Sequence, residues 1–310
     1  MDLRQLRYFV TIVDCGSLSR ASERLHIAQP SLSQHVVGME SDLGTPLLLR
    51  NPQGVVPTEA GKTLYRQASQ LLRQFENLCH EVRGAGSGEV GKVTVGLPTS
   101  VAAVLAMPLY LSLKQRHPGV QVNFIERTND NLADLLANGR LDMAVLFCDL
   151  ESRGMAIRPL LLDSLSVYGN PSTLTSWEIG ETTTARQLSE RPIVLPGPET
   201  NLRTLVQRIF TRSESKLSVS ADIDSFLIRL SLAASEGVCT ILSSGLRTFG
   251  AAHGLDEVPI IEAIGSRTVS LCWLTTTPAS AAAESTRELI VATCQTLVSE
   301  RIWVGAQLVG

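Results

Sequence analysis

Residues 16–34 read GSLSRASERLHIAQPSLSQ, and this stretch sets the fold of the amino-terminal part of the chain. Gly16 is placed to end a preceding helix, and Ser17 is a good N-cap for the helix that follows. After a brief connection a third helix begins near Gln29 and Pro30, because the missing N–H of proline costs nothing in a first helical turn. The apolar residues of this third helix are spaced four, three and four apart on one face: Leu32, Val36, Met39 and Leu43.

The residues on either side complete a winged helix-turn-helix. Upstream, apolar residues recur at helical spacing from Leu3 to Val13. Downstream, two short apolar runs flank the turn Asn51–Gly54, whose proline and glycine favour a hairpin. Two helices joined by a tight turn and followed by a hairpin predict an all-α winged helix-turn-helix domain over residues 1–58.

Residues 59–90 are expected to form a long linker helix and a hinge. Thr58 is a suitable N-cap, and Glu59 in the first turn matches the helix dipole. Six apolar residues follow at alternating spacings of four and three, and we call them the heptad seam: Leu64, Ala68, Leu71, Phe75, Leu78 and Val82. So narrow a stripe favours a dimerising helix over one that packs only on its own domain. The glycine-rich residues 84–88 end the helix as a flexible linker.

Short apolar runs alternate with helical stretches over residues 91–310, which predicts an α/β domain with a mainly parallel sheet. The pattern restarts near Leu165. We therefore expect two similar lobes with a ligand cleft between them, an arrangement like that of periplasmic binding proteins. The first lobe takes about residues 91–163 and 268–300, and the second takes about 164–267. The chain as a whole belongs to the α/β class.

Composition excludes several classes of protein. The chain has 310 residues, of which 44% are hydrophobic and 18% charged, as in an ordinary globular protein of two or three domains. The longest apolar run, Val101 to Leu111, is much shorter than the roughly 20 residues of a membrane span. The sequence begins without an apolar leader, so we expect a cytoplasmic protein with no membrane partner. The net charge of −3 means that any DNA affinity must come from locally placed cations.

We expect no metal, no cofactor and no catalytic centre. The six cysteines and five histidines are scattered without metal-site spacing, and the thiols are expected to be free. The common nucleophile, phosphate-loop and zinc-protease motifs do not occur. Asp222 and Asp224 are conceivable as an acid pair, but Asp224 is better explained as the N-cap of a helix over residues 225–236. The sequence therefore does not indicate an enzyme.

Several of these segments together resemble the LysR-type transcriptional regulators. The resemblance is dense from residue 1 to about residue 66, and it is carried by GSLSRAS (16–22), HIAQPSLSQ (26–34) and PTEAG (57–61). Within the family, HIAQPSLSQ and RYFVTIV (7–13) are most similar to the nitrogen assimilation control branch. Beyond residue 66 the chain fits the family by length and by the order of its elements.

The third helix is the expected DNA-reading element. Its apolar face points inward, so four polar residues lie outward or at the amino-terminal end that normally enters the major groove: Gln29, Ser31, Ser33 and Gln34. The resemblance implies that Gln29, Pro30, Ser33 and Gln34 lie at the base-reading surface.

Positive charge is sparse around this helix. His35 is its only potential cation for a phosphate, and Arg50 at the foot of the wing is a candidate phosphate or minor-groove contact. No Arg or Lys occurs between Arg24 and Arg50, whereas the family's helix is often richer in arginine. We therefore expect a shallow salt dependence per protomer, with affinity gained by joining two or four such helices on one DNA.

Two strand ends are expected to line the ligand cleft, because hydroxyl side chains there precede a helix N-terminus, a grip suited to a carboxylate. The resemblance implies that the effector pocket includes Thr99, Ser100 and the loop around Thr200. The full set of candidates is Thr99, Ser100, Thr128, Phe147, Gly197, Thr200 and Asn201. The alternative for each Ser or Thr is an ordinary N-cap.

The sequence thus predicts a DNA-binding transcription regulator. The resemblance implies four partners: promoter DNA with an interrupted palindrome, further copies of the chain in a dimer or tetramer, RNA polymerase, and a small acidic or amino-acid-like effector. Two alternatives remain open. In the first, the regulator is constitutive and is controlled by its abundance. In the second, the α/β part is a receptor or an enzyme, and the amino-terminal part is only an assembly module. The sequence leaves the packing of Trp303 undecided.

Overall fold

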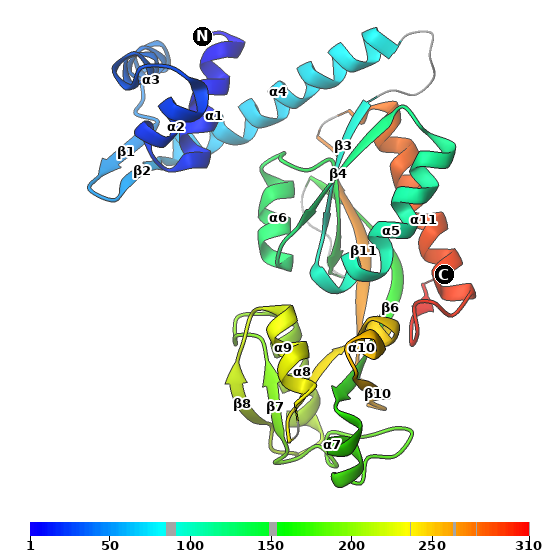
Figure 1. The fold of residues 1–310 in the computed structure, drawn as a ribbon. Helices are drawn as coiled ribbons and strands as arrows, with labels where there is room; N and C mark the ends of the chain where they lie inside the picture. The colour runs from blue at the N-terminus through cyan, green and yellow to red at the C-terminus, as the bar shows by residue number, and fades with distance from the viewer. Residues whose placement is uncertain (85–90, 149–153, 236, 263–264, 277, 310) are drawn as a thin grey trace.

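A computed structural model describes residues 1–84, 91–148, 154–235, 237–262, 265–276 and 278–309. Three parts follow one another along the chain: a helical amino-terminal domain, one long helix and a two-lobed α/β domain (Figure 1). Over these ranges no helix is both long and apolar enough to span a bilayer. Most of the predicted glycine hinge, from residue 85 on, lies outside the described residues.

The amino-terminal domain contains the predicted helices and hairpin. Its elements are α1 (Leu3–Cys15), α2 (Leu18–Leu25), α3 (Gln29–Leu43), β1 (Leu48–Asn51) and β2 (Gly54–Pro57). Gly16 ends α1 in the left-handed region at φ 58°, and Ser17 caps α2 by accepting a hydrogen bond from the N–H of Arg20 at 3.4 Å. The prediction that four residues form the buried apolar face of α3 is wrong for one of them. Leu43 is 44% exposed, because the chain turns at Gly44 toward the hairpin immediately after it.

The long helix α4 spans Glu59–Gly84 and begins where the sequence predicts. Thr58 Oγ1 accepts a hydrogen bond from the N–H of Gly61 at 3.0 Å. The first half of α4 packs on the amino-terminal core through Ala68 and Leu72, both buried. Its second half extends beyond that domain (Figure 1).

The α/β domain is built on one sheet with the strand order β4-β3-β5-β11-β6-β9-β7-β8, to which β10 and β12 add by pairing with β6. The first lobe holds β3 (Gly91–Leu97), α5 (Thr99–Arg116), β4 (Val120–Glu126), α6 (Asn129–Ala137), β5 (Met143–Phe147) and α11 (Ala281–Ser299). The second lobe holds α7 (Pro171–Ser176), β7 (Pro192–Leu195), α8 (Asn201–Arg212), β8 (Ser218–Asp222), α9 (Phe226–Ala233), β9 (Cys239–Ser243), the short 3₁₀ turn η1 (Ser244–Leu246), α10 (Arg247–Ala252) and β10 (Asp256–Pro259). The strands β6 (Met155–Gly169) and β11 (Ser266–Leu274) join the lobes, and the terminal β12 (Gln307–Leu308) pairs with β6.

The sheet is mixed, and the expectation of a mainly parallel sheet is wrong. β3 runs parallel to β4 and β5, and β7 runs parallel to β8 and β9. In contrast, β11 is antiparallel to β5 and β6, and β6 is antiparallel to β9. β6 and β11 connect the two lobes directly and lack the crossover helix that parallel neighbours require. The strand expected near Leu165 is part of β6, which already begins at Met155.

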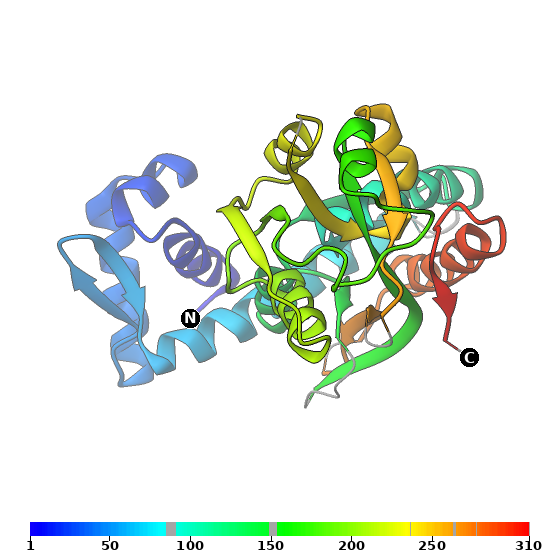
Figure 2. The same cartoon turned by 90° about the horizontal axis from the view of Figure 1, so that it is seen from below.

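The carboxyl-terminal segment is packed against the connection between the lobes. β12 pairs with β6 at Leu161 and Leu162, and Figure 2 shows it beside that strand. Trp303, whose packing the sequence leaves undecided, is 2% exposed and belongs to the main hydrophobic core. The tail therefore stabilises the α/β domain.

Candidate nucleic-acid interface and ligand cleft

The amino-terminal end of α3 presents a polar face. Gln29, Pro30, Ser31 and Gln34 are exposed, and Ser33 is half-buried. Ala28, the N-cap residue, makes no side-chain hydrogen bond to the first turn. Among the described residues no side chain caps the first N–H groups of the helix, which suits the binding of a phosphate there.

Arg50 of the wing lies against this polar face. Its Nη2 donates a hydrogen bond to Ser33 Oγ at 3.0 Å. The opposite face of α3 is fixed in the core by Leu32, Val36 and Met39, all at most 1% exposed. The same core thus positions both the polar end of α3 and an exposed guanidinium that can contact a DNA phosphate.

His35 lies at the inner edge of α3. It is half-buried, and its ring centroid is 5.2 Å from that of Tyr8 on α1. This contact packs α3 against α1. A phosphate contact from His35 remains a prediction.

The heptad seam divides into two parts. Leu64 and Ala68 pack into the amino-terminal core. The remaining four are exposed at 43–68%: Leu71, Phe75, Leu78 and Val82. This row of apolar side chains along one helix lacks a cover within the described part of the single chain, as expected of a surface that meets another protein.

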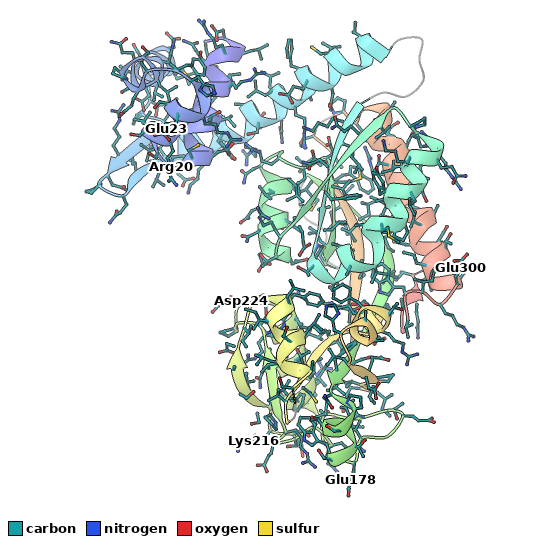
Figure 3. All side chains as sticks on the ribbon, viewed as in Figure 1. Arg20, Glu23, Glu178, Lys216, Asp224 and Glu300 are labelled. Carbon is teal, nitrogen blue, oxygen red and sulfur yellow. The ribbon has the colours of Figure 1, made fainter. Side chains whose placement is uncertain are left out.

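A cavity of about 150 Å³ lies between the two lobes. Six of the seven predicted effector residues line it: Thr99, Ser100, Thr128, Phe147, Thr200 and Asn201. Gly197 is not among the lining residues. Its N–H donates a hydrogen bond to Oδ1 of Asp224 at 2.9 Å, and Asp224 does line the cavity. Figure 3 labels Asp224 on the edge of the second lobe that faces the first.

The expected cap role of Asp224 is wrong. α9 begins at Phe226, one residue later than the prediction allows, and its N-cap is Ser225. Ser225 Oγ accepts a hydrogen bond from the N–H of Ile228 at 3.4 Å. The Asp224 carboxylate is thereby left for Gly197 and the cleft.

Two of the predicted hydroxyl groups already have structural partners. Thr200 caps α8, since its Oγ1 accepts from the N–H of Arg203 at 3.3 Å and donates to the carbonyl of Gly197 at 2.9 Å. Thr99 Oγ1 donates to Oε1 of Glu126 at 2.7 Å. The N-cap alternative therefore holds for Thr200, although the residue also lines the cavity.

Three arginines that were not among the predicted residues also line the cleft: Arg127, Arg229 and Arg267. The guanidinium of Arg267 lies 3.4 Å from the centroid of the Phe147 ring. It also donates to Oδ2 of Asp163 at 3.1 Å and to Ser100 Oγ at 3.4 Å. Burial lowers the pKa of Arg267, and the charge of Asp163 opposes that effect.

Arg229 is 6% exposed on the second-lobe side of the cleft. Its Nη1 donates to the carbonyl of Ile223 at 3.2 Å, while its Nε has no hydrogen-bond partner among the described residues. Burial lowers the pKa of Arg229 to about 10, so it still carries its charge at neutral pH. Both Arg229 and Arg267 could have been identified in the sequence, because each is the only charged residue of a largely apolar element. These elements are FLIRLSLA for Arg229 and SRTVSLCWL for Arg267.

Within the described ranges, no group of three or more His, Cys, Asp or Glu side chains is arranged to hold a metal ion. Cys15, Cys79, Cys239, Cys272 and Cys294 are free thiols. The Sγ atoms of Cys148 and Cys272 lie 3.5 Å apart in the first lobe.

Comparison with protein families gives two matches that together span most of the chain. Residues 3–62 match the bacterial regulatory helix-turn-helix protein of the lysR family, and residues 86–295 match the LysR substrate binding domain. The nitrogen assimilation regulatory protein nac of Klebsiella aerogenes is 36% identical over 257 residues, which cover 82% of this chain and 83% of that protein. Its counterpart in Escherichia coli strain K12 is 33% identical with the same coverage. Both matches agree with the resemblance to the nitrogen assimilation control branch.

Solved structures share the fold at low sequence identity. A single-residue variant of full-length OxyR from Pseudomonas aeruginosa has a TM-score of 0.71 at 22% identity, covering 95% of both chains. CbnR, a LysR family transcriptional regulator, has a TM-score of 0.67 at 19% identity, covering 95% of this chain and 99% of that one. A complex of full-length CbnR with its target DNA has a TM-score of 0.56 at 19% identity, covering 95% of this chain and all of that one.

Proposed function

The chain belongs to the LysR family of DNA-binding transcriptional regulators with an effector-binding domain, and we propose that it reads an interrupted palindrome in promoter DNA as a homodimer or tetramer. The main support for this proposal is the exposed polar end of α3, where Nη2 of Arg50 lies 3.0 Å from Oγ of Ser33. Gln29 and Gln34 offer amides for adenine, and Ser31 and Ser33 offer hydroxyls that accept or donate. Pro30 presets the first turn of this base-reading helix, and His35 and Arg50 add phosphate contacts.

Assembly follows from the exposed half of the heptad seam. Leu71, Phe75, Leu78 and Val82 repeat at the spacing of a coiled-coil interface, so a second copy of α4 is the partner that fits them. Dimerisation places two α3 helices on one DNA, which multiplies a modest affinity per helix. In this division residues 1–58 bind DNA, residues 59–90 dimerise, and residues 91–310 respond to ligand. The known complex of CbnR with target DNA supports the docking of such a domain on a duplex.

The cleft between the lobes takes a small carboxylate or amino acid as effector. Arg127, Arg229 and Arg267 supply positive charge to a cavity of about 150 Å³, and Asp224 supplies a counterpart for an ammonium group. The predicted candidates Thr99, Ser100, Thr128, Phe147 and Asn201 line the same space. The effector acts only if it binds the two states of the oligomer with different affinity.

A constitutive regulator is the second candidate, and one observation favours it. Arg267 is already paired with Asp163 and stacked on Phe147, so this cation of the cleft is satisfied without a ligand. A regulator of this kind responds only to its own abundance. Either way the protein acts in the cytoplasm at a promoter, contacts RNA polymerase and performs no catalysis.

The DNA-binding proposal is tested by mobility shift with the DNA upstream of the protein's own gene. We expect discrete, saturable complexes that survive an excess of scrambled competitor DNA. Binding that the competitor removes completely would contradict sequence-specific recognition.

The effector proposal is tested by calorimetry against a panel of small monocarboxylates, dicarboxylates and amino acids. We expect one of them to bind the wild type and to lose at least about tenfold in affinity with Arg229→Gln. Arg208→Gln is the control, since Arg208 is exposed on α8 and does not line the cleft. If no member of the panel produces heat of binding, the result supports the constitutive regulator.

A further inference from the structure

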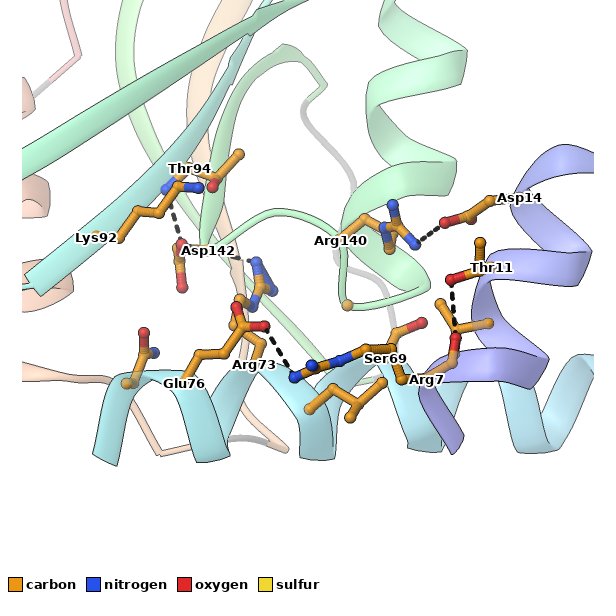
Figure 4. Close-up of a pocket in the computed structure, with 14 residues that line it drawn as sticks. Arg7, Thr11, Asp14, Ser69, Arg73, Glu76, Lys92, Thr94, Arg140 and Asp142 are labelled. Carbon is orange, nitrogen blue, oxygen red and sulfur yellow. Dashed lines mark hydrogen bonds and ion pairs between the residues drawn. The ribbon is translucent and has the colours of Figure 1, made fainter. Parts of the chain in front are cut away.

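A second cavity, of about 330 Å³, lies where the amino-terminal domain meets the first lobe. Its walls come from α1, from α4, from β3 and from the turn between α6 and β5, as Figure 4 shows. None of its lining residues lines the effector cleft. We call this region the joint.

One carboxylate in the joint links all three parts of the chain. Asp14 lies in the last turn of α1 in the amino-terminal domain, and its Oδ2 lies 2.6 Å from Nη1 of Arg140 in the first lobe. Its Oδ1 accepts a hydrogen bond from the hydroxyl of Tyr65 on α4 at 2.6 Å. Burial and the bond to Asp14 raise the pKa of Tyr65 to about 12, so the phenol keeps the proton it donates. The hydroxyl of Tyr65 on the linker helix therefore helps to position Asp14 for its ion pair with Arg140.

A second contact reinforces the first. Arg73 of α4 donates through Nη2 to the carbonyl of Leu141, and its Nη1 lies 3.6 Å from Oδ2 of Asp142. Asp142 also accepts a hydrogen bond from the N–H of Thr94 at 2.7 Å, which fixes it within the first lobe. Figure 4 shows Arg73, Asp142 and Thr94 close together at the cavity.

The joint is nevertheless imperfectly satisfied. Ser69 Oγ and Arg73 Nη1 are buried without a hydrogen-bond partner among the described residues. The ion pair with Asp142 compensates Arg73 Nη1 in part, whereas Ser69 Oγ has no such charge beside it in the described part of the chain. The lining of the joint is mostly polar, and domains that meet through a polar interface can move relative to each other. The closed joint is thus held by few specific contacts.

From these contacts we propose that Asp14 and Arg140 form a releasable latch that sets the angle of the winged helix-turn-helix relative to the first lobe. The latch makes both residues positioning residues for DNA binding. Closed, it holds α3 of each protomer at a defined direction and so selects the spacing between half-sites. Open, it leaves α3 intact but its direction variable. This inference rests on the proposed function, because spacing has meaning only for a protein that binds paired half-sites.

The test is a charge swap in the full-length protein. Asp14→Arg, Arg140→Asp and the double variant are titrated against palindromes whose half-sites are separated by different spacers. The wild type prefers one spacer. We expect each single variant to lose about tenfold of that preference and the double variant to regain it. Arg116→Asp, an exposed charge reversal on α5 away from the joint, should behave like the wild type.

Tyr65→Phe keeps the packing of the joint and removes only the hydroxyl that binds Asp14. We expect it to weaken the spacer preference in the same direction, which keeps the proposal testable if a swap variant fails to fold. Unchanged spacer preference in the single variants, or in Tyr65→Phe where these do not fold, overturns the latch. If the wild type binds none of the palindromes, the result contradicts the proposed function instead.

Discussion

Nε1 of Trp303 donates a hydrogen bond to Oδ1 of Asp163 at 3.0 Å, although the two residues are 140 positions apart. The same carboxylate accepts from Ser243 Oγ at 2.6 Å and pairs with Arg267 through its other oxygen at 3.1 Å. Asp163 is 1% exposed and lies on β6, the strand that runs through both lobes. One buried carboxylate therefore joins the carboxyl-terminal tail, the second lobe and the wall of the ligand cleft.

Asp163→Asn should strongly destabilise the α/β domain. The substitution keeps the side-chain volume but leaves the buried guanidinium of Arg267 without its counterion, which costs about 3–5 kcal/mol. Urea unfolding measures the loss. Asp256→Asn, at an exposed position of β10, is the matched control and should change stability by less than about 0.5 kcal/mol. Equal stability of the two variants would show that the Asp163 network is not a structural centre.

Arg50→Ala should weaken DNA binding through the loss of one phosphate contact. We expect a similar loss on operator and on scrambled DNA, and a slope of log affinity against log salt that is shallower by about 1 per protomer. Fluorescence anisotropy at several salt concentrations measures both. Arg24→Ala, an exposed cation at the end of α2, serves as the comparison. A loss confined to the operator would instead assign Arg50 to base reading.

Phe75→Asp should break the oligomer. Phe75 is 43% exposed in the middle of the uncovered part of the heptad seam, where a charge cannot be buried against a second helix. Sedimentation equilibrium should report a smaller species than for the wild type. Arg66→Gln, on an exposed face of the same helix, should leave the mass unchanged. An unaltered mass for Phe75→Asp excludes the seam as the dimer interface.

Stability should fall in alkaline solution partly through Cys294. Burial raises the pKa of its thiol from 9.0 to about 12, so the unfolded chain releases that proton first. The contribution of this thiol is complete below about pH 9 and is lost as the pH rises toward about 12, by about 2 kcal/mol at about pH 10.5. Urea unfolding of Cys294→Ala should therefore show a smaller decrease between about pH 8 and about pH 10.5 than the wild type. Cys79→Ala, at a half-buried position, provides the control; identical decreases in all three proteins refute the assignment.

Local signals in the sequence were sufficient for most of the amino-terminal domain. Gly16 and Ser17 define a helix end and a helix start through backbone conformation and capping, which depend on neighbouring residues alone. The polar face of α3 follows from the spacing of its buried residues in the same way. Six of the seven predicted effector residues line one cavity because strand ends before helices meet at the same edge of a sheet.

Long-range relations were not predictable in this way. The direction of β6 and β11 depends on how two lobes share one sheet, and no turn or periodicity within either strand records it. Arg267 and Trp303 meet at Asp163 from segments far apart in the chain. The partition of the heptad seam between Ala68, which is buried, and Leu71, which is exposed, depends on where α1 packs against α4.

Recognition of DNA bases by α3 is tested with the Ser33→Ala/Gln34→Ala double variant. Its affinity for the operator and for scrambled DNA is measured by anisotropy beside that of the wild type. We expect the variant to lose most of its preference for the operator, at least about tenfold, while its weak affinity for scrambled DNA is unchanged. An undiminished preference for the operator would contradict base reading by this helix.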